Sequence, residues 1–352
     1  MYFVMYDRFL NSLGETYILE SWSRIQRAAD FDELKITGEQ VPYSVEPFFV
    51  VANDRQGKMQ FSGLASTPVI DDKQKKTTIS LKDYMTLFNT DVLVDWSQLD
   101  TENLTLAGYL EFLFNVWLDQ TSVGFDNIFC DVREVSEILW DTENIPLGTD
   151  TESVLLYTLI KDAMNFYELY CLPVLDVYHK SLTFRFYPCG KHIREVRLRD
   201  FGIEAVEKSF GEYNRATVYS STWEKQSEWA LTENNSIVKL PSQTSLVYPA
   251  KNRNFIADEP SEDLTFEQSI WNATYDAVMS LADNRYQENI DLDLQRYKTV
   301  VDLTDMDFSY RASVYAEKGW YRTLPVGEIE TDSKGKHIIR LGHRVQELTQ
   351  EI

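Results

Sequence analysis

Short runs in which hydrophobic and polar residues alternate fill the first hundred positions. Residues 2–10 and 16–21 flank a turn at 11–14 that closes on Gly14, and this pattern predicts a β-hairpin. Two further hairpins are predicted by the same signals. They pair residues 48–52 with 59–65 and residues 68–70 with 77–81, and a short helix over 82–88 and a strand over 91–94 follow. Short strands joined by tight turns predict a small antiparallel barrel or sandwich.

The spacing of apolar residues then changes to that of helices. One apolar face runs from Leu106 to Leu118 behind Thr105. A second helix is predicted from the capping-box pattern at residues 149–152 and extends to Tyr170. A third begins with a similar box at Thr265 and is expected to end near residues 283–284.

Strand patterns return between and after these helices. Leu182, Phe184 and Phe186 alternate with Thr183, Arg185 and Tyr187, the period of a half-buried strand. Its expected partner covers residues 174–178, across a turn at 179–181. Other predicted strands cover 215–219, 236–238, 297–302, 309–315 and 338–341, and residues 240–260 are predicted to be irregular.

These elements predict an α+β protein with two small antiparallel β-barrel-like domains and helical insertions. The expected division is a first barrel-like domain over 1–100, a helical acidic segment over 101–175, a mixed β segment over 176–250, and a second barrel-like domain with a leading helix over 251–352. The domains need not be continuous in sequence.

Composition limits the class of protein. Of 352 residues, 43% are apolar and 47 are aromatic, which excludes disorder for want of burial. No stretch approaches the ~20 apolar residues of a membrane helix, and the first residues do not resemble a signal peptide. Three dispersed cysteines indicate neither a disulfide framework nor a metal site, and favour a reducing compartment during folding.

Charge disfavours one class of partner. With 34 basic and 56 acidic residues the formal net charge is -22, which opposes sequence-specific nucleic-acid binding. The charge is unevenly spread, since residues 101–176 carry 14 acidic and 2 basic residues whereas residues 177–225 carry 6 acidic and 9 basic ones. Neighbouring segments of opposite sign suggest distinct faces, one of them paired with another chain.

Residues with catalytic or metal-binding chemistry are few. His179, His192, His337 and His343 lack the i, i+4 pairing of a zinc helix, and a surface role is favoured over general-base work for His179 and His337. Cys130, Cys171 and Cys189 lie among apolar or aromatic residues, as buried thiols do. Gly-rich phosphate loops and serine-hydrolase motifs are absent. We therefore assign no catalytic, cofactor-binding or metal-binding residues.

Carboxylates and aromatic residues leave alternatives open. Asp302, Asp305 and Asp307 form the richest acidic patch, for which a solvated loop is favoured over a Ca²⁺ site or a hydrolytic carboxyl pair. The excess of tyrosine and tryptophan is more typical of cores and interfaces than of sugar-stacking platforms.

The order of elements resembles a known family. In residues 61–94 a strand carrying Phe61-Ser-Gly63 leads into a long hairpin, the returning strand feeds a short helix, and a strand starting at Asp91 follows. Further likenesses are the helix over 151–170 that leads into a hairpin over 173–187, and Leu324-Pro-Val-Gly327 ahead of a closing hairpin. On these segments the chain resembles the tail-associated (Tal) proteins of siphophages of Gram-positive hosts, in the short form of lactococcal phages, which are related in fold to the hub of contractile-tail baseplates.

The resemblance implies a structural protein of the virion tail tip, assembled in the host cytoplasm. It implies a homotrimer whose barrel-like domains form a pseudo-sixfold ring on the hexameric distal tail protein, and which closes the tail tube until DNA passes. Many family members continue into a peptidoglycan-degrading domain. This chain stops at Ile352, ahead of such a domain, so no enzyme activity is expected. The alternative is a protein that binds or degrades cell-wall carbohydrate, which predicts a concave aromatic cleft with two carboxyls.

Overall fold

A computed structural model defines most of the chain. It describes residues 2–7, 9–16, 21–39, 41, 48–54, 56, 59–65, 69–71, 76–121, 125, 127–141, 147, 151–203, 207–209, 211–232, 236–261, 264–284, 287–297, 302–317 and 319–342. None of the helices in these ranges is long and apolar enough to cross a membrane.

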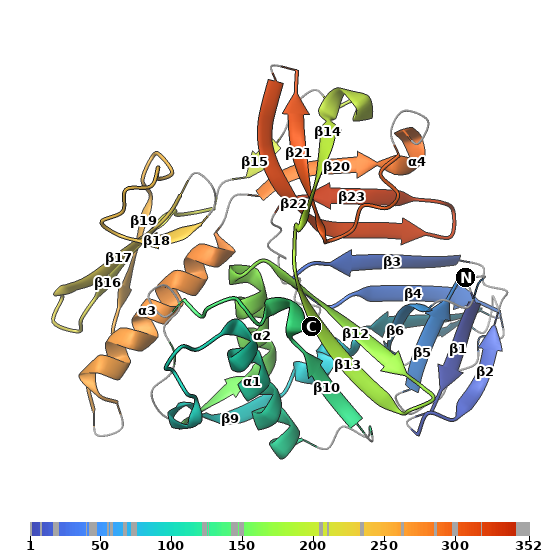
Figure 1. Cartoon of the computed structure of the whole chain (residues 1–352), viewed down its shortest axis with the longest axis horizontal. Coiled ribbons are helices and arrows are strands. Elements are labelled where there is room, and N and C mark those ends of the chain that lie inside the picture. Colours follow the sequence, from blue (N-terminus) through green and yellow to red (C-terminus); the bar gives the residue numbers. More distant parts are fainter. Residues whose placement is uncertain are drawn as a thin grey trace.

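A large branched sheet joins the first and last parts of the chain (Figure 1). Its main path runs through β15 (Glu207–Ser209), β20 (Gln287–Asp293), β23 (His337–Leu341), β22 (Gly319–Asp332), β3 (Ser21–Arg27), β4 (Glu33–Gly38), β8 (Lys76–Lys82), β6 (Met59–Ala65), β5 (Phe48–Asn53), β1 (Tyr2–Tyr6) and β2 (Ser12–Thr16). Side branches are β7 (Val69–Asp71) on β8, and β21 (Tyr310–Ala316) followed by β14 (His192–Arg197) on β22. The junction is the antiparallel pair of β22 and β3, in which Glu328 lies opposite Arg27.

Strand β5 shows why the N-terminal part holds together. Its first five residues are all buried. Phe48, Val50 and Ala52 belong to the core of the N-terminal sheet, whereas Phe49 and Val51 belong to the core of the middle of the molecule. An uninterrupted apolar run is what a strand covered on both faces requires.

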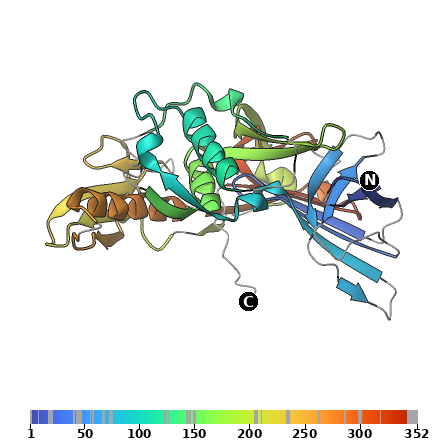
Figure 2. The same cartoon turned by 90° about the horizontal axis from the view of Figure 1, so that it is seen from below.

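The middle of the molecule is a three-stranded sheet covered on one face by helices (Figures 1 and 2). The strands are β10 (Asn127–Asp131), β13 (Ser181–Pro188) and β12 (Leu169–Asp176), with β13 central, parallel to β10 and antiparallel to β12. The helical elements here are η1 (Tyr84–Phe88), η2 (Trp96–Gln98), α1 (Leu106–Gln120), η3 (Arg133–Val135) and α2 (Leu156–Phe166), together with the strand pair β9 (Asp91–Asp95) and β11 (Thr151–Leu155).

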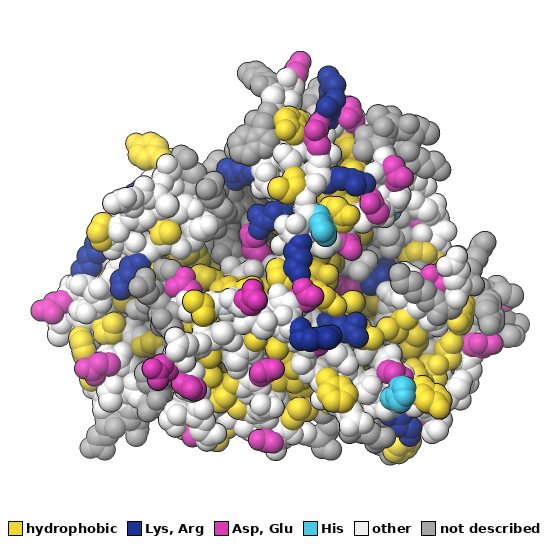
Figure 3. Space-filling model, viewed as in Figure 1, with side chains coloured by type: hydrophobic (Ala, Val, Ile, Leu, Met, Phe, Trp, Pro, Cys, Tyr) yellow, Lys and Arg dark blue, Asp and Glu magenta, His cyan; other side chains and the backbone are white. Residues whose placement is uncertain are grey.

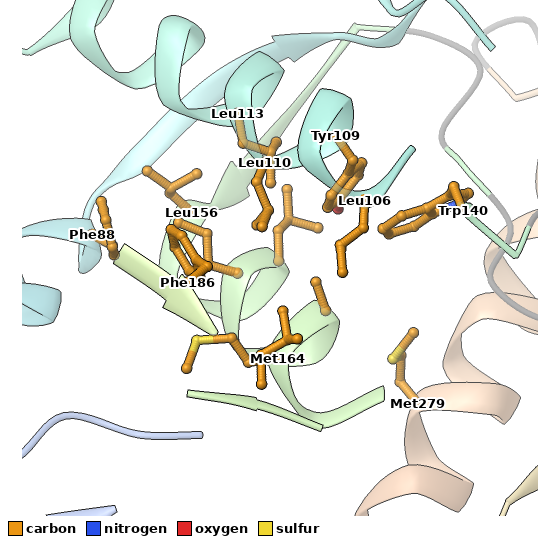
Figure 4. Close-up of a cluster of buried hydrophobic side chains, with 14 of the residues drawn as sticks. Phe88, Leu106, Tyr109, Leu110, Leu113, Trp140, Leu156, Met164, Phe186 and Met279 are labelled. Carbon is orange, nitrogen blue, oxygen red and sulfur yellow. The ribbon is translucent and has the colours of Figure 1, made fainter. Parts of the chain in front are cut away.

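Aromatic side chains fill the space between this sheet and the helices. Phe88 of η1 lies 4.6 Å from Phe184 of β13 and 5.0 Å from Trp117 of α1, measured between ring centroids. Trp117 and Phe184 are fully buried. Figure 4 shows the adjoining part of this core, where Leu106, Tyr109 and Leu110 of α1 face α2 and β13.

A lateral unit consists of a four-stranded sheet and one long helix (Figure 1). The strands are β18 (Ile237–Lys239), β17 (Lys225–Leu231), β16 (Arg215–Tyr219) and β19 (Asn252–Ile256), and α3 (Phe266–Asp283) packs on them. The predicted capping box at the start of α3 is confirmed, because the Thr265 side chain and Gln268 satisfy each other's backbone N–H groups. Tyr275 of α3 donates a 2.8 Å hydrogen bond to Asp162 of α2, which ties the unit to the middle of the molecule. Two short helices, η4 (Leu198–Phe201) and α4 (Leu294–Tyr297), complete the described elements.

Two local predictions are wrong by a few residues. Residues 151–155 form strand β11 rather than the start of a helix, and residues 149–150 of the predicted capping box lie outside the described residues. Helix α2 begins at Leu156 without a side-chain cap and ends at Phe166, whereas Tyr170, its predicted end, lies on β12. The pairing of β11 with β9 outweighs the local capping signal. The first hairpin exists, but Ser12 and Gly14 belong to its second strand. Its turn is formed earlier, where the Asp7 carboxylate accepts hydrogen bonds from the backbone N–H groups of Phe9 and Asn11.

Other predictions are corrected in part. The span predicted to be irregular contains β19, which gains its order from parallel pairing with β16. Tyr297 ends the helix α4 instead of starting a strand, and residues 298–301 lie outside the described residues. A mixed α+β fold is confirmed. The pairings of the described strands close neither predicted barrel, so the two-barrel description and the domain boundaries stay predictions.

Candidate interaction surface

The outer face of the three-stranded sheet presents three rows of side chains. The strand registers set these rows, because residues paired across strands point to the same face. The first row is Phe129, Thr183 and Val174, the second is Asp131, Arg185 and Leu172, and the third is Tyr187 and Tyr170. Alternate residues of the same strands, such as Leu182, Phe184 and Leu175, are buried against the helices. We call the three rows the outer face.

Apolar side chains on the outer face are unusually open to solvent. Phe129 is 52% exposed and Leu172 is 41% exposed. Hydrophobic side chains lie among basic and acidic ones where Figure 1 draws these strands (Figure 3). Apolar groups bordered by charges are typical of protein–protein contacts, because the apolar part gains from burial and the charges orient the partner.

Charged groups on this face are held in fixed positions. Arg133 donates to both carboxylate oxygens of Asp131, at 2.8 Å and 2.7 Å, and Arg185 Nε lies 3.8 Å from the same carboxylate. The hydrogen bonds from Arg133 hold the pKa of Asp131 below its usual value. One carboxylate thus faces two guanidinium groups, and Asp176, which pairs with Ser181 on the same side of the sheet, adds a second carboxylate to this face.

Stacked rings connect the outer face to the C-terminal part. The rings of Tyr170 and Tyr187 stack at 5.1 Å, and Tyr170 also lies 5.5 Å from Phe308. Burial raises the pKa of Tyr170, so its phenol stays neutral at physiological pH. The outer face is therefore attached to two cores.

The histidines singled out in the sequence are scattered. His179 is exposed in the turn between β12 and β13, where its Nδ1 lies 2.7 Å from Asp176. His192 is exposed on β14 beside the ring of Tyr310. His337 is half-buried on β23, and burial lowers its pKa, so it is not the plain surface residue that the sequence suggests. His343 lies outside the described residues.

The three cysteines are unpaired, and burial keeps their thiols protonated. Cys130, Cys171 and Cys189 are free thiols on partly buried residues. Burial raises the pKa of all three thiols, for Cys189 to about 12, and a protonated thiol is a poor nucleophile. These values agree with the structural role that the sequence favours.

The acidic patch does not converge on a common point. Asp302 accepts hydrogen bonds from Thr304, Asp307 accepts from Ser309, and Asp305 forms a 2.8 Å ion pair with Arg194. Within the described ranges no three His, Cys, Asp or Glu residues are grouped as metal ligands. The three carboxylates thus serve local turns and one ion pair.

A buried acidic pair, which the sequence analysis missed, joins the N-terminal sheet to η1. The Asp83 carboxylate accepts from the N–H groups of Met85 and Asp32, both at 2.9 Å, and the Asp32 carboxylate accepts from Arg24 at 3.2 Å. Burial raises the pKa of both carboxyls, that of Asp83 most. Because backbone N–H groups and Arg24 already occupy both carboxyls, we assign the pair a structural role in holding η1 against the N-terminal sheet.

A hollow of about 520 Å³ lies beside β17 in the lateral unit. Its lining consists of Arg215, Lys225, Gln226, Ser227, Glu228, Lys239, Leu240, Pro241 and Ser242. It contains one carboxylate and no aromatic ring, whereas a glycoside-hydrolysing cleft needs two carboxyls. This hollow is therefore not the cleft that the carbohydrate-degrading alternative predicts.

Sequence reasoning missed one edge of the outer face. The alternation that predicts β13 already places Thr183, Arg185 and Tyr187 on one side. Strand β10 was not predicted, because it spans five residues and its order comes from parallel pairing with β13. The apolar stretch of Ile128, Phe129 and Cys130 was the signal available for it.

Comparison with solved structures gives matches over nearly the whole chain. The 43 kDa tail protein of prophage MuSo2 from Shewanella oneidensis is 12% identical, with a TM-score of 0.52 over 97% of this chain and 98% of that one. Prophage tail protein gp18 from Listeria monocytogenes EGD-e is 11% identical, with a TM-score of 0.51 over 98% of this chain and 96% of that one. The sequence matches no protein-family model and no curated protein. The chain therefore has the fold of these two prophage tail proteins.

Proposed function

We propose that this protein is a structural component of a bacteriophage tail tip, located in the virion and assembled in the host cytoplasm. The observation that carries the proposal is the shared fold, which extends over at least 97% of this chain in both tail proteins. Full-length agreement at 11–12% identity indicates that the whole architecture, rather than one local motif, is common to them. The absence of a converging catalytic group in the described residues fits a structural role but does not carry it.

The finer proposal is a homotrimeric hub of the Tal type. Three copies would adapt the sixfold tail to threefold symmetry, bind the hexameric distal tail protein, close the tail tube and open it for DNA. The outer face supports the self-association step, because it presents the exposed apolar side chains of Phe129 and Leu172 beside charged groups.

Net charge supports the conduit role. Three copies carry a formal charge of -66, three times -22. Where acidic side chains line a channel, repulsion of like charges keeps DNA from adhering as it passes. A trimer structure with an electropositive channel wall would contradict this part of the proposal.

Mass measurement in solution tests the trimer. Light scattering coupled to size exclusion is expected to give about 123 kDa, three times 41.0 kDa. Phe129→Glu is expected to yield monomers, because it places a charge at the more exposed of the two apolar side chains in the proposed contact. Leu93→Glu is the matched control, since Leu93 is a similarly exposed strand residue, 56% against 52%, on β9.

These measurements test the trimer and the position of its interface separately. A monomeric wild-type protein at tens of micromolar would rule out the trimer. A trimer that survives Phe129→Glu would leave the assembly intact and remove the outer face from its interface. Co-elution of the trimer with the distal tail protein of the same phage is the further expected result.

A further inference from the structure

The turn between β3 and β4, residues 28–32, lies near the centre of the molecule, where three of its parts meet (Figure 1). The Ala28 N–H donates a 3.1 Å hydrogen bond to a backbone carbonyl of β22, in the C-terminal part of the large sheet. Asp30 faces helix α2, where its carboxylate contacts the Tyr157 hydroxyl and lies 3.7 Å from Lys161 Nζ. The turn therefore joins the large sheet to the helical middle of the molecule.

A third contact of this turn is with the start of η1. The Asp83 N–H donates a 3.0 Å hydrogen bond to the Asp32 carbonyl, and the Asp32 N–H donates a 2.9 Å bond back to the Asp83 carboxylate. The other oxygen of that carboxylate accepts from the Met85 N–H, which belongs to η1. One side chain, that of Asp83, thus ties the turn and η1 together.

Three carboxyls meet at this junction, but only two cations pair with them. Asp30, Asp32 and Asp83 are at most 14% exposed. Asp32 pairs with Arg24 at 3.2 Å and Asp30 with Lys161 at 3.7 Å. Within the described residues no Lys or Arg side chain pairs with Asp83, whose carboxylate accepts from backbone donors. Ionisation of all three carboxyls therefore leaves one buried negative charge without a balancing cation.

Other ionisable groups around Asp83 supply no balancing charge. Tyr84 of η1, Tyr157 of α2 and Cys171 of β12 all lie close enough for its charge to act on them. Burial raises the pKa of each of these groups above its ordinary value, so all three are neutral at physiological pH.

Two further cations on neighbouring strands are engaged elsewhere. Arg27 of β3 pairs with Glu33 of β4 at 3.2 Å and with Glu328 of β22 at 3.3 Å. The Lys82 ammonium on β8 lies 4.3 Å from the centroid of the Phe31 ring. The charge balance of the junction consequently depends on whether Asp83 carries a proton.

The energetics of Asp83 have a definite sign. Burial and the charge of Asp32 raise its pKa, and the N–H groups of Asp32 and Met85 offset only part of this rise. A carboxyl whose pKa is higher in the closed than in the opened form stabilises the closed form most at low pH. That stabilisation is lost as pH rises through the pKa of the closed form.

We propose that the turn at residues 28–32 is a proton-controlled joint, in which a proton on Asp83 holds the turn against η1 and α2 and its release to solvent favours their local separation. The joint does not depend on the proposed tail function. It acts on the contact between the large sheet and the helical middle, so a rise in pH loosens this contact before the rest of the molecule.

Hydrogen exchange of the full chain, measured by mass spectrometry at pH 5 and pH 8, tests the joint. Protection, the ratio of the intrinsic to the observed exchange rate, removes the direct effect of pH on the chemistry of exchange. In peptides that cover residues 28–33 and 84–88, protection is expected to fall at least about tenfold from pH 5 to pH 8, since each unit of pKa elevation allows a tenfold change. In β16, residues 215–219 of the lateral unit, it is expected to change less than twofold.

Asp83→Asn and Asp91→Asn separate the charge of Asp83 from other titrations. Asp83→Asn is uncharged at both pH values, so protection of residues 28–33 is expected to change less than twofold between them. Asp91 is an exposed aspartate on β9, and Asp91→Asn is expected to keep the wild-type change. Thermal unfolding of both variants verifies that they are folded.

Lys161→Met is a second variant, which leaves Asp83 in place. The Lys161 side chain is 32% exposed, so the chain can accommodate its replacement. Because one of the two balancing cations is lost, the fall in protection of residues 28–33 between pH 5 and pH 8 is expected to be larger than in the wild type.

Any of four results would overturn the proposal. The first is equal protection of residues 28–33 in the wild type at the two pH values. The second is the wild-type fall in Asp83→Asn, which assigns the effect to another group. The third is a parallel fall in β16, which shows that the whole molecule opens rather than the joint. The last is a fall in Lys161→Met no larger than that of the wild type.

Discussion

Replacing Gly63 with alanine is expected to destabilise the folded protein strongly, because the added methyl group has no space. Gly63 lies on β6, opposite Val50 of β5, at the point where β6 begins to pair with β8. A Cβ atom at this position would lie 2.3 Å from the Lys82 carbonyl oxygen and 2.9 Å from Cε1 of Phe61. The first distance is 1.1 Å shorter than the 3.4 Å at which ordinary contact begins.

The size of the effect follows from what must move. The Phe61 ring can rotate, but the Lys82 carbonyl belongs to the backbone of β8, which is itself paired with β4. The clash with Lys82 can therefore be removed only if β6 and β8 separate, which breaks their pairing at Leu64 and Ala65. Overpacking typically costs about 1–3 kcal/mol, and we expect about 3 kcal/mol here because backbone is the obstacle. At about 2.1 cal/mol/K of unfolding entropy per residue, this corresponds to a fall in Tm of roughly 4 °C for a chain of 352 residues that unfolds as one unit.

Gly108→Ala is the matched control, since it adds the same methyl group in a helix. A Cβ atom at this position of α1 would meet Leu104 Cδ1 at 3.4 Å and Thr105 Oγ1 at 3.5 Å, which are ordinary contacts. Alanine is expected to stabilise the helix by about 0.5–1 kcal/mol, because glycine loses more backbone entropy.

Thermal and chemical denaturation of the two variants beside the wild type measure the difference. The expected result is opposite signs, with Gly63→Ala lower in Tm and Gly108→Ala equal or higher. Wild-type stability in Gly63→Ala would refute the close-approach argument. A loss in Gly108→Ala as large as that in Gly63→Ala would show that added volume, and not strand separation, is the cause.

Three further changes test other parts of the structure. Trp117→Ala is expected to lower the free energy of unfolding by about 3–5 kcal/mol, measured by denaturant titration, because a fully buried ring is lost from the core; a loss below 1 kcal/mol would contradict its burial. Arg340→Met is expected to cost about 1–3 kcal/mol, since the half-buried carboxylates of Glu328 and Glu330 each lose a partner, and a neutral result would contradict the ion-pair network. Asp83→Ser keeps an oxygen acceptor but removes a carboxyl whose pKa in the folded state is raised. The stability of the wild type relative to the variant is therefore expected to fall as pH rises from about 4 through the folded-state pKa, by about 1.4 kcal/mol for each unit by which that pKa is raised. A stability difference that stays constant from pH 4 to 8 would refute the raised pKa.

Local signals explain which elements could be predicted from the sequence. The capping box at Thr265 and the alternation along β13 are satisfied by residues a few positions away, so the sequence suffices to predict them. Gly63 and Gly327 belong to the two short motifs that the chain shares with the resembled family, and close packing explains why glycine stands at both positions. A Cβ atom at either residue would lie 2.3 Å from a backbone oxygen.

Distant pairing explains what the sequence could not show. Residues 149–152 carry a helix-start pattern, but residues 151–155 form a strand through pairing with β9, some sixty residues earlier. The outer face was equally hidden, since Phe129, Arg185 and Leu172 become neighbours only through the register of three strands. Periodicity indicates which side of a strand is buried but not which strands adjoin it.

The junction of β22 with β3 has a consequence for synthesis of the protein. Arg27 and Glu328, which meet there in an ion pair, are 301 residues apart. At a translation rate of about 5–20 residues per second, the edge of β3 waits roughly 15–60 s for its partner strand to be made. During that interval the nascent chain exposes an unpaired strand edge, which is a site for aggregation or chaperone binding. The pairing of β3 with β22 can therefore form only after nearly the whole chain has been made.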